Sequence, residues 1–514
     1  MIFPQQLKMP DKYRYLLAAA LAGFLFIPAN PPFNQGYFAW FSLLPLLWAS
    51  SQVTPKKAFF LGLISGLPIH LYLNFYLRHV FFIYLPFPLA LATLIALVLY
   101  ISCFNGFFSL AFNLVNRFKT RWITALSAPA LWLLMEYARS QTFLAYNVGY
   151  LGYTQWNYTA LLQIVSLYGY WGLPFIMVLL QTTILFAFSS RRNKSAVIIC
   201  VSVLILLLAA GFTLPGLFST VYTGTKIPVA LIQGNISPRQ VLTENRSDIL
   251  TEHLQMTQQA YQTDPSIKLV IWPETVVSLD FSNKKTHLPA IKHTADKLDI
   301  SLLYGAKIRE NNNLFNAITI YNPDQITMPV YHKQHLVPFV EYFPLESLLN
   351  RALQLDLLLG RYIPGDQITI FHLDDVKIAG VICFESYFGN HTRQFARAGA
   401  EHLFVLTNDA WFDRSIGLEL HANIAAIRAA EMGIGVTQVA NSGITISFDY
   451  RGKELFRTNK MEKAIITYNL DLAGRKTVYT KLGDYFPLFW AFFLVVTIPY
   501  SWFKEKNNVK IKNP

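Results

Sequence analysis

The stretch VKIAGVICFES, residues 376–386, decides how the rest of the chain is interpreted. Its first seven residues are mostly apolar and include several β-branched side chains, which is typical of a buried strand. The strand delivers Cys383, and Glu385 follows two residues later. A thiol held at a rigid strand end beside a carboxylate can serve as a nucleophile. A single cysteine on an apolar strand can equally be inert core packing, so the surrounding sequence has to decide.

Two further stretches place polar groups where strands end: LVIWPE (residues 269–274) and YHKQHLVPFVEYFP (residues 331–344). In the first, a proline stops strand pairing just before Glu274. In the second, Lys333 and Glu341 lie on either side of a strand-breaking proline. The three groups can share the work of a thiol enzyme. Glu274 would take the thiol proton, Lys333 would lower the thiol pKa and stabilise an oxyanion, and Cys383 would attack.

Glu274, Lys333 and Cys383, in this order and in these surroundings, resemble the nitrilase superfamily. Within it, the chain is most similar to the bacterial apolipoprotein N-acyltransferase family, in which such a domain hangs from a bundle of membrane helices. The resemblance covers nearly the whole chain and is carried by four motifs: WPET (272–275), the run from Lys333 through VPF (337–339) to Glu341, CFE (383–385) and NDAWF (408–412). It implies a four-layer αββα sandwich for the polar domain.

The resemblance also implies a function. Cys383 would accept an acyl chain from a membrane phospholipid as a thioester and pass it to the α-amine of the diacylglyceryl-cysteine that begins an apolipoprotein. Glu274 would act as base and then as acid, and Lys333 would support the oxyanion. Glu341 and Glu385 would orient Lys333, the nucleophile or the incoming amine; alternatively, they are buried structural carboxylates paired with basic neighbours.

Composition indicates a membrane protein, because 53% of the 514 residues are hydrophobic and only 14% are charged. The net charge is +13, yet residues 220–484 contain 26 Lys and Arg against 27 Asp and Glu. The basic surplus therefore lies in the hydrophobic part and its short connections. That distribution is typical of membrane topology and argues against nucleic acid as a partner.

Eight hydrophobic segments are long enough to suggest membrane spans: 14–30, 35–52, 57–77, 86–113, 122–140, 158–190, 195–216 and 485–503. The sixth is long for one span and contains Gly172 and Pro174, so we expect a kink or an interfacial start. We therefore predict a transmembrane bundle over 1–219, an extracytoplasmic catalytic domain over 220–484, and a last helix with a cytoplasmic tail over 485–514.

Positive charge sets the orientation. Lys and Arg gather at both termini and in alternate loops, whereas the opposite loops hold only Arg78 and Arg139. The positive-inside rule then places both termini in the cytoplasm and the catalytic domain in the periplasm of a bacterial inner membrane. We expect a monomer.

Residues 220–484 alternate between strand and helix patterns. Expected strands lie near 227–233, 268–272, 301–305, 314–321, 376–382, 402–407, 434–440, 443–449 and 464–470, and expected helices near 246–261, 287–298, 390–398 and 419–431. This is an α/β pattern, and by itself it does not distinguish a sandwich from a doubly wound sheet.

Metal and cofactor signals are missing from the sequence. The eleven histidines show no metal-ligand spacing, and no phosphate-binding glycine motif is present, so we predict no metal and no cofactor. His421, on the expected helix 419–431, is interpreted as structural. Cys103 and Cys200 lie in apolar segments, so the polar domain has no disulfide.

Three other segments leave alternatives open. The leucine-rich run Leu345–Leu359 is either a core helix or a lid that dips into the membrane and admits an acyl chain. Glu136 and Arg139, three apart on one helix, form either a local ion pair or a group facing the substrate. Tyr146 and Leu242 stand where relatives often have tryptophan, so no lipid contact is assigned to them; the aromatic loop 143–157 is expected at the membrane interface.

Two competing functions follow from the same residues. A membrane-tethered amidase of the nitrilase type would hydrolyse a small carbon–nitrogen substrate and let water resolve the thioester. A transporter or receptor with a degenerate nitrilase module would need no catalysis, and the intact Glu274, Lys333 and Cys383 argue against it.

Overall fold

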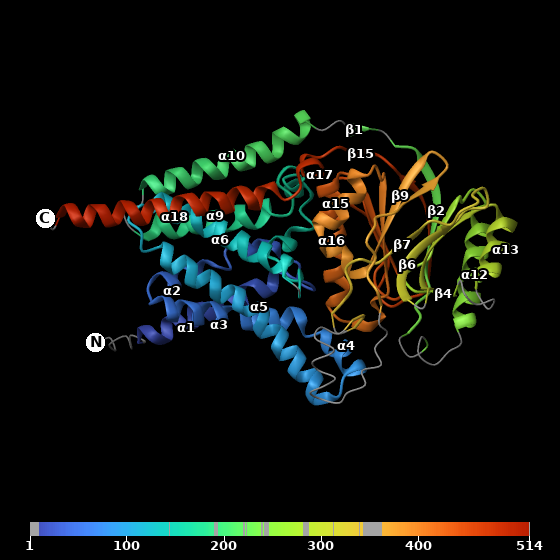
Figure 1. Ribbon diagram of the computed structural model, residues 1–514, viewed down its shortest axis with the longest axis horizontal. Helices are drawn as coiled ribbons and strands as arrows, with labels where there is room; N and C mark the ends of the chain where they lie inside the picture. Colours follow the sequence, from blue (N-terminus) through green and yellow to red (C-terminus); the bar gives the residue numbers. More distant parts are fainter. Residues whose placement is uncertain are drawn as a thin grey trace, which may run out of the picture.

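The computed structural model describes residues 10–142, 144–189, 194–218, 221–222, 224–237, 240, 246–280, 287–311, 313–338, 340–342 and 362–512. Helices fill one end of an elongated molecule and two β-sheets fill the other (Figure 1). Both termini lie at the end of the helical bundle that is remote from the sheets. Leu345–Leu359 and Leu242 lie outside the described residues, so the two alternatives for the leucine-rich run, core helix or lid, stay open.

Two sheets form the α/β part. The six-stranded sheet has the order β13 (Glu454–Arg457), β12 (Ile446–Phe448), β11 (Gly435–Ala440), β10 (His402–Thr407), β9 (Val376–Ile382) and β8 (Ile370–Leu373). The seven-stranded sheet has the order β14 (Ala464–Asp471), β2 (Lys226–Gln233), β3 (Leu269–Ile271), β5 (Ser301–Glu310), β6 (Asn313–Tyr321) and β7 (Val330–His332), with β4 (Val277–Asp280) paired to β5.

The sheets pack face to face, and helices cover both outer faces. β6 contacts β9 and β2 contacts β11 across the sandwich. Helices α12 (Arg246–Thr263) and α13 (Leu288–Leu298) cover the seven-stranded sheet, while α15 (Gly389–Arg397) and α16 (Gly417–Met432) lie beyond the six-stranded sheet (Figure 1). A Cβ on Gly380 of β9 would lie 2.8 Å from Ile318 Cδ1, so glycine permits this close approach. The result is the expected αββα sandwich.

All nine expected strands and all four expected helices of the sandwich are present, with boundaries shifted by a few residues. The sequence did not predict β4, β7, β8 and β13, nor the two-residue strands β1 (Val221–Tyr222) and β15 (Gly474–Arg475) that pair with each other. These strands have at most four residues, and such short runs carry too little hydrophobic alternation to be recognised.

The helical part contains α1 (Asp11–Phe26), α2 (Leu44–Ser51), α3 (Pro55–Asn74), α4 (Leu77–Tyr84), α5 (Phe87–Val115), α6 (Arg121–Gln141), α7 (Thr159–Leu162), α8 (Val165–Tyr168), α9 (Gly172–Ser189), α10 (Lys194–Phe218) and α18 (Tyr485–Lys512). Three described helices, α5, α10 and α18, are long and apolar enough to cross a membrane. Two bent pairs, α3 with α4 and α7–α8 with α9, raise the number to five if each pair is one span. The predicted count of eight spans is therefore not confirmed.

Two predicted spans need correction. Segment 35–52 is not one helix: it contains a 3₁₀ turn, η2 (Gly36–Trp40), followed by α2, whose eight residues reach only about 12 Å against a hydrocarbon core of about 30 Å. Segment 158–190 is broken between Tyr168 and Gly172, and the chain bends by 108° at this break. The expected kink is present, and it is sharp enough to end the helix rather than bend it.

Candidate active site

Cys383 is held at a strained backbone turn. It follows β9 and opens the 3₁₀ turn η5 (Cys383–Tyr387), with φ +50°, a left-handed conformation that residues other than glycine seldom adopt. β9 runs parallel to β10 with Ile382 opposite Leu406, so Cys383 and Asn408 emerge at the same edge of the sheet. The side chain of Cys383 is half-buried.

Glu274 reaches this edge from the other sheet. It follows β3, and the next residue, Thr275, has φ +54°. A Cβ on Gly305 of the adjacent strand would lie 2.6 Å from Glu274 Cα, so only glycine lets the turn pass. Glu274 Oε2 accepts a hydrogen bond from Asn408 N at 2.9 Å, and Oε1 accepts one from Asn316 Nδ2 at 2.7 Å. The carboxylate is thus anchored to both sheets.

Lys333 follows β7, and only 1% of its side chain is exposed. Its Nζ lies 2.9 Å from Glu341 Oε2 and 3.8 Å from Glu274 Oε1. Burial by itself would lower the pKa of Lys333, but Glu341 and Glu274 outweigh burial and hold that pKa well above its usual range. The side chain is therefore an ammonium, with a charge shared between two carboxylates.

Glu341 holds Lys333 in place. One oxygen of its carboxylate accepts from Lys333 Nζ at 3.0 Å and from Asn316 Nδ2 at 2.9 Å, and the other accepts from Val337 N at 2.8 Å. Asn316 donates to both Glu341 and Glu274 and so fixes the spacing of the two carboxylates. The sequence did not identify Asn316, because it is distant in the chain and belongs to no motif.

Glu385 ties the lysine segment to the cysteine turn. It is fully buried and accepts from Ile382 N at 2.8 Å, Tyr331 Oη at 2.8 Å, Gln334 N at 2.7 Å and His335 N at 3.1 Å. Burial raises the pKa of Glu385 despite these donors. Glu385 joins β9 to the segment after β7, and neither a hydrogen bond nor an ion pair within 4.0 Å links it to Lys333.

The charges favour a neutral thiol at rest. Burial and the negative charge of Glu274 raise the pKa of Cys383 well above its ordinary value, and Lys333 only partly offsets them. Lys333 lowers the thiol pKa as expected, but burial and Glu274 outweigh its effect. Burial also raises the pKa of Glu274, which makes its carboxylate a better proton acceptor.

Asp409 and His421 complete the surroundings of the thiol. Asp409 opens the 3₁₀ turn η6 (Asp409–Phe412), and His421 comes from α16. A carboxylate oxygen of Asp409, a ring nitrogen of His421 and Cys383 Sγ all lie within 4.8 Å of one another, a spacing compatible with a metal ion. Both ring nitrogens of His421 are already engaged, one with Asp409 Oδ1 and one with the carbonyl oxygen of Cys383, so a metal would have to break a hydrogen bond. The absence of a metal stays a prediction.

The helical part reaches the cysteine turn through the loop 144–157. Tyr146 stacks on Phe384 with ring centroids 6.2 Å apart and donates to Asn74 Oδ1. Asn147 Nδ2 donates to Tyr387 O at 3.2 Å. The aromatic loop that we expected at the membrane interface therefore packs against η5.

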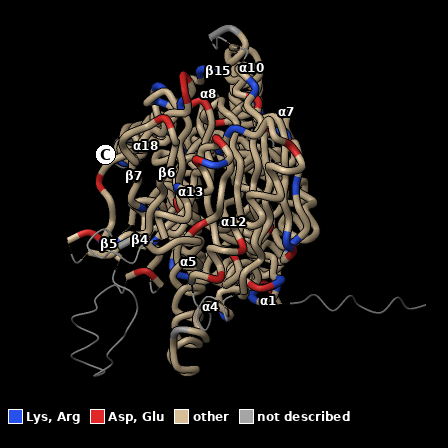
Figure 2. The backbone as a smooth tube through the Cα atoms, turned by 90° about the vertical axis from the view of Figure 1, so that its right-hand side faces the viewer, with Lys and Arg blue, Asp and Glu red and all other residues tan. Residues whose placement is uncertain are grey.

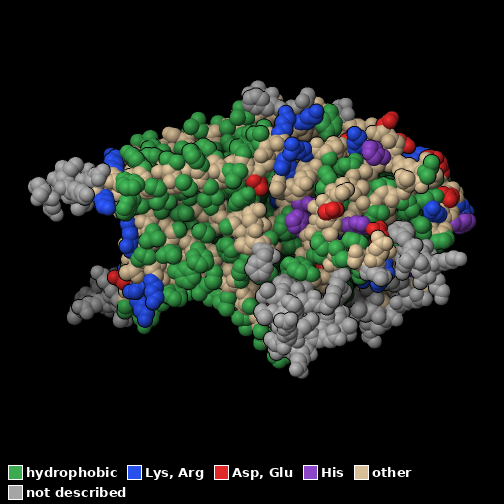
Figure 3. All heavy atoms as spheres, in the orientation of Figure 1, with side chains coloured by type: hydrophobic (Ala, Val, Ile, Leu, Met, Phe, Trp, Pro, Cys, Tyr) green, Lys and Arg blue, Asp and Glu red, His purple; other side chains and the backbone are tan. Residues whose placement is uncertain are grey.

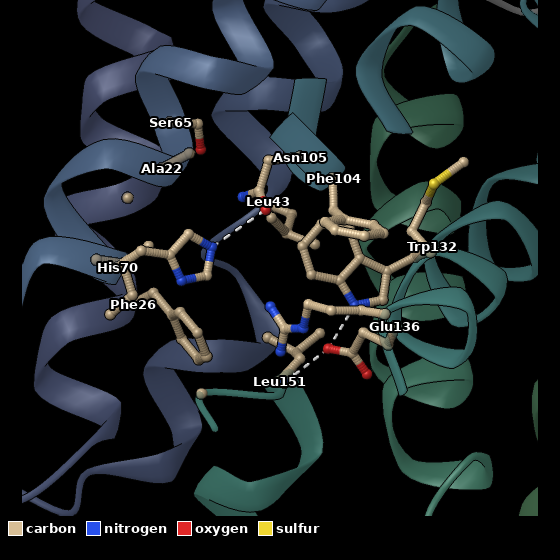
Figure 4. Close-up of a pocket in the computed structure, with 15 residues that line it drawn as sticks. Ala22, Phe26, Leu43, Ser65, His70, Phe104, Asn105, Trp132, Glu136 and Leu151 are labelled. Carbon is tan, nitrogen blue, oxygen red and sulfur yellow. Dashed lines mark hydrogen bonds between the residues drawn. The ribbon is translucent and has the colours of Figure 1, made fainter. Parts of the chain in front are cut away.

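Glu136 and Arg139 line a cavity inside the bundle, and Figure 4 shows Glu136 at this cavity together with Trp132 and Leu151. Glu136 accepts from Trp132 Nε1 at 3.2 Å, Leu151 N at 2.8 Å and Tyr170 Oη at 2.8 Å. Arg139 donates to a carbonyl of the loop 144–157 at 3.2 Å. Among the described residues no ion pair within 4.0 Å joins Glu136 to Arg139, so of the two alternatives the local ion pair is not supported.

Comparison with known proteins gives two family matches. Residues 228–479 match the carbon-nitrogen hydrolase family, and residues 22–183 match the apolipoprotein N-acyltransferase N-terminal domain.

Individual relatives match over nearly the whole chain. An apolipoprotein N-acyltransferase of Geobacter metallireducens is 30% identical over 94% of this chain and 95% of its own length. Another, from Treponema denticola, is 27% identical over the same shares. Among solved structures, an amidase of the nitrilase superfamily from Nesterenkonia is 16% identical, with a TM-score of 0.37 over 49% of this chain and 92% of its own.

Proposed function

The chain belongs to the apolipoprotein N-acyltransferase family, and from that membership we propose that Glu274, Lys333 and Cys383 transfer an acyl chain from a membrane phospholipid to the N-terminal diacylglyceryl-cysteine of lipoproteins. One observation carries the assignment. Glu274 and Lys333 lie 3.8 Å apart at the ends of two strands of one sheet. Asn408 N donates to Glu274, and Glu385 accepts from Gln334 N beside Lys333, so both segments are tied to the edge of the other sheet where Cys383 stands.

The first half-reaction forms a thioester. Glu274 accepts the thiol proton as Cys383 Sγ attacks the ester carbonyl carbon of the donor. The Lys333 ammonium faces the negative oxygen of the tetrahedral intermediate, an interaction typically worth about 3–4 kcal/mol. The carbon–oxygen bond to glycerol then breaks, and Glu274 returns the proton to the leaving oxygen. A lysophospholipid departs and the acyl chain stays on sulfur.

The second half-reaction forms the amide. The neutral α-amine of the acceptor attacks the thioester carbonyl carbon and gives a proton to Glu274. The carbon–sulfur bond breaks, and Cys383 regains its proton. Glu341 keeps Lys333 in place during both steps, and Glu385 keeps the cysteine turn against the lysine segment.

The arrangement of charge supports the proposed topology. Figure 3 shows hydrophobic side chains over the helical end and Lys and Arg at its far tip. Figure 2 looks onto the sandwich end, where both signs of charge are interspersed. Both termini would then be cytoplasmic and residues 220–484 periplasmic, between a bundle over 1–219 and a final segment over 485–514. We propose a monomer that needs no cofactor.

The hydrolytic alternative is not favoured, because residues 22–183 match a domain described for apolipoprotein N-acyltransferases. Intact-protein mass spectrometry tests the choice. After incubation with phosphatidylethanolamine, the wild type should gain one acyl mass and Cys383→Ala should gain none. A diacylglyceryl-cysteine peptide should discharge the adduct and become acylated. An adduct that only water discharges would identify a hydrolase.

A further inference from the structure

His421 is buried beneath the cysteine turn and contacts three groups there. Its Nδ1 lies 2.9 Å from Asp409 Oδ1, and its Nε2 lies 3.1 Å from the carbonyl oxygen of Cys383 and 3.3 Å from Ser386 Oγ. His421 is 2% exposed, and Asp409 is completely buried. Thr407 Oγ1 donates to the same Asp409 oxygen at 2.7 Å.

These contacts determine where the protons are. An ionised carboxylate and a peptide carbonyl can only accept hydrogen bonds. We therefore assign Nδ1 as the donor to Asp409 and Nε2 as the donor to Cys383 O, which lies closer to Nε2 than the hydroxyl of Ser386 does. A ring that donates from both nitrogens is an imidazolium. With this assignment the two side chains form a buried ion pair rather than a neutral histidine beside an acid.

The surroundings of His421 are consistent with a positive ring. Tyr387 from η5 stacks on it with centroids 5.6 Å apart, and Phe412 from η6 approaches edge-on. Asp409 and, more weakly, Glu274 are the charged groups that act on it. Burial alone would lower the pKa of His421, but Asp409 raises it above its ordinary value.

The pair also touches the proposed nucleophile in two ways. It holds the carbonyl of Cys383, whose left-handed φ of +50° needs support from its neighbours. It also places one carboxylate within 4.8 Å of Cys383 Sγ, with Asp409 Oδ2 buried and without a hydrogen-bond partner. Left uncompensated, that negative charge would oppose formation of a thiolate.

We propose that Asp409 and His421 are a positioning ion pair for Cys383: His421 fixes the cysteine turn through the Cys383 carbonyl and neutralises Asp409 beside the thiol. The inference rests on the proposed function in taking Cys383 as the nucleophile. It predicts that His421 and Asp409 differ in their effects on the thiol, although they share one hydrogen bond.

The test measures the thiol directly. The full-length protein carrying Cys103→Ala and Cys200→Ala keeps Cys383 as its single cysteine. The rate of its modification by methyl methanethiosulfonate, followed by intact mass, gives a pH midpoint for the thiol. The variants are His421→Gln and Asp409→Asn. His402→Gln is the matched control, because His402 is equally buried but lies at the opposite end of β10.

His421→Gln should raise the midpoint by at least about one pH unit, because it leaves the Asp409 charge uncompensated. Asp409→Asn should leave it within about half a unit, since a neutral histidine beside an amide also has no net charge. His402→Gln should not move it. An unmoved midpoint in His421→Gln, or an equal rise in Asp409→Asn, overturns the ion pair.

A second measurement does not depend on the folding of His421→Gln. With ¹⁵N-labelled histidine at about pH 8, where exposed histidines are neutral, one ring should keep both nitrogens protonated. Asp409→Asn should convert that signal to a neutral tautomer, and its absence from the parent protein refutes the proposal. Neither measurement requires acyl transfer. A failure of the proposed function would instead appear as full lipoprotein acylation by Cys383→Ala.

Discussion

Replacing Glu341 by glutamine tests the division of labour between the two carboxylates around Lys333. Nζ lies 2.9 Å from Glu341 Oε2 and 3.8 Å from Glu274 Oε1. At an effective dielectric constant of about 20, the attractions at these distances are about 6 and about 4 kcal/mol. In Glu341→Gln the ammonium loses its stronger partner and pairs with Glu274 alone.

That new pairing should slow thioester formation. A tighter ion pair with Lys333 lowers the basicity of Glu274 and draws the ammonium away from the oxyanion. If the Lys333–Glu274 distance closes from 3.8 to 2.9 Å, that attraction grows by about 1.4 kcal/mol, and the same amount is added to the barrier for proton transfer to Glu274, equivalent to a rate about tenfold lower. Single-turnover formation of the acyl adduct, followed by rapid quenching and mass spectrometry, measures this rate.

Glu310→Gln is the matched control, since Glu310 faces His332 at 3.7 Å with a third of its side chain exposed. It should acylate at the wild-type rate. If a folded Glu341→Gln protein acylates within about threefold of wild type, Glu341 does not keep Glu274 free, and the assigned roles are wrong.

Three further outcomes follow from the geometry. Cys383→Ala should abolish the acyl adduct while leaving expression and membrane insertion intact, as immunoblots of membrane fractions would show. Glu274→Gln should prevent adduct formation. Because the pKa of Glu274 is raised, the wild-type acylation rate should fall as pH falls through that pKa, and a rate that stays constant at acid pH would contradict the role of Glu274 as the base. Burial raises the pKa of Glu431 to about 7 despite its pairing with Arg428. The folded state therefore binds the Glu431 proton more tightly than the unfolded state does, and this proton stabilises the fold at low pH. The stabilisation should be lost as pH rises from about 4.5 to about 7, and the melting temperature of Glu431→Gln should not show that loss.

Short sequence motifs predicted the catalytic residues better than they predicted the arrangement of the sheets. Cys383 was recognisable because an apolar strand leads directly to it, and Lys333 and Glu341 because only eight residues separate them. The donors that fix the carboxylates, Asn316 and Asn408, come from different sheets and meet only after folding. Strand periodicity contains no information about which sheets face each other.

The membrane part was harder to predict for a related reason. Hydropathy identifies apolar length, and segments 35–52 and 158–190 have it. Hydropathy does not show whether the segment remains one helix, because that depends on the tertiary contacts that its backbone makes. In the second segment, the chain leaves the helix at Gly169 with φ +66°, a conformation that the aromatic residues beside it would adopt only at a cost.

This break joins the two parts of the molecule. Tyr170 N donates to Glu431 of α16, and Trp171 Nε1 donates to Asp484 Oδ1 at 2.8 Å. A continuous helix would satisfy the backbone N–H of Tyr170 internally and could not offer it to Glu431. The broken helix thus fixes the sandwich on the bundle, and the loop 144–157 adds a second attachment at the cysteine turn. Under the proposed function and topology, this attachment would set the height of Cys383 relative to the bilayer that holds the donor's acyl chains. Trp171→Phe should lower acylation of bilayer phospholipid more than acylation of a donor dispersed in detergent, and equal losses on both donors would show that the contact serves folding alone.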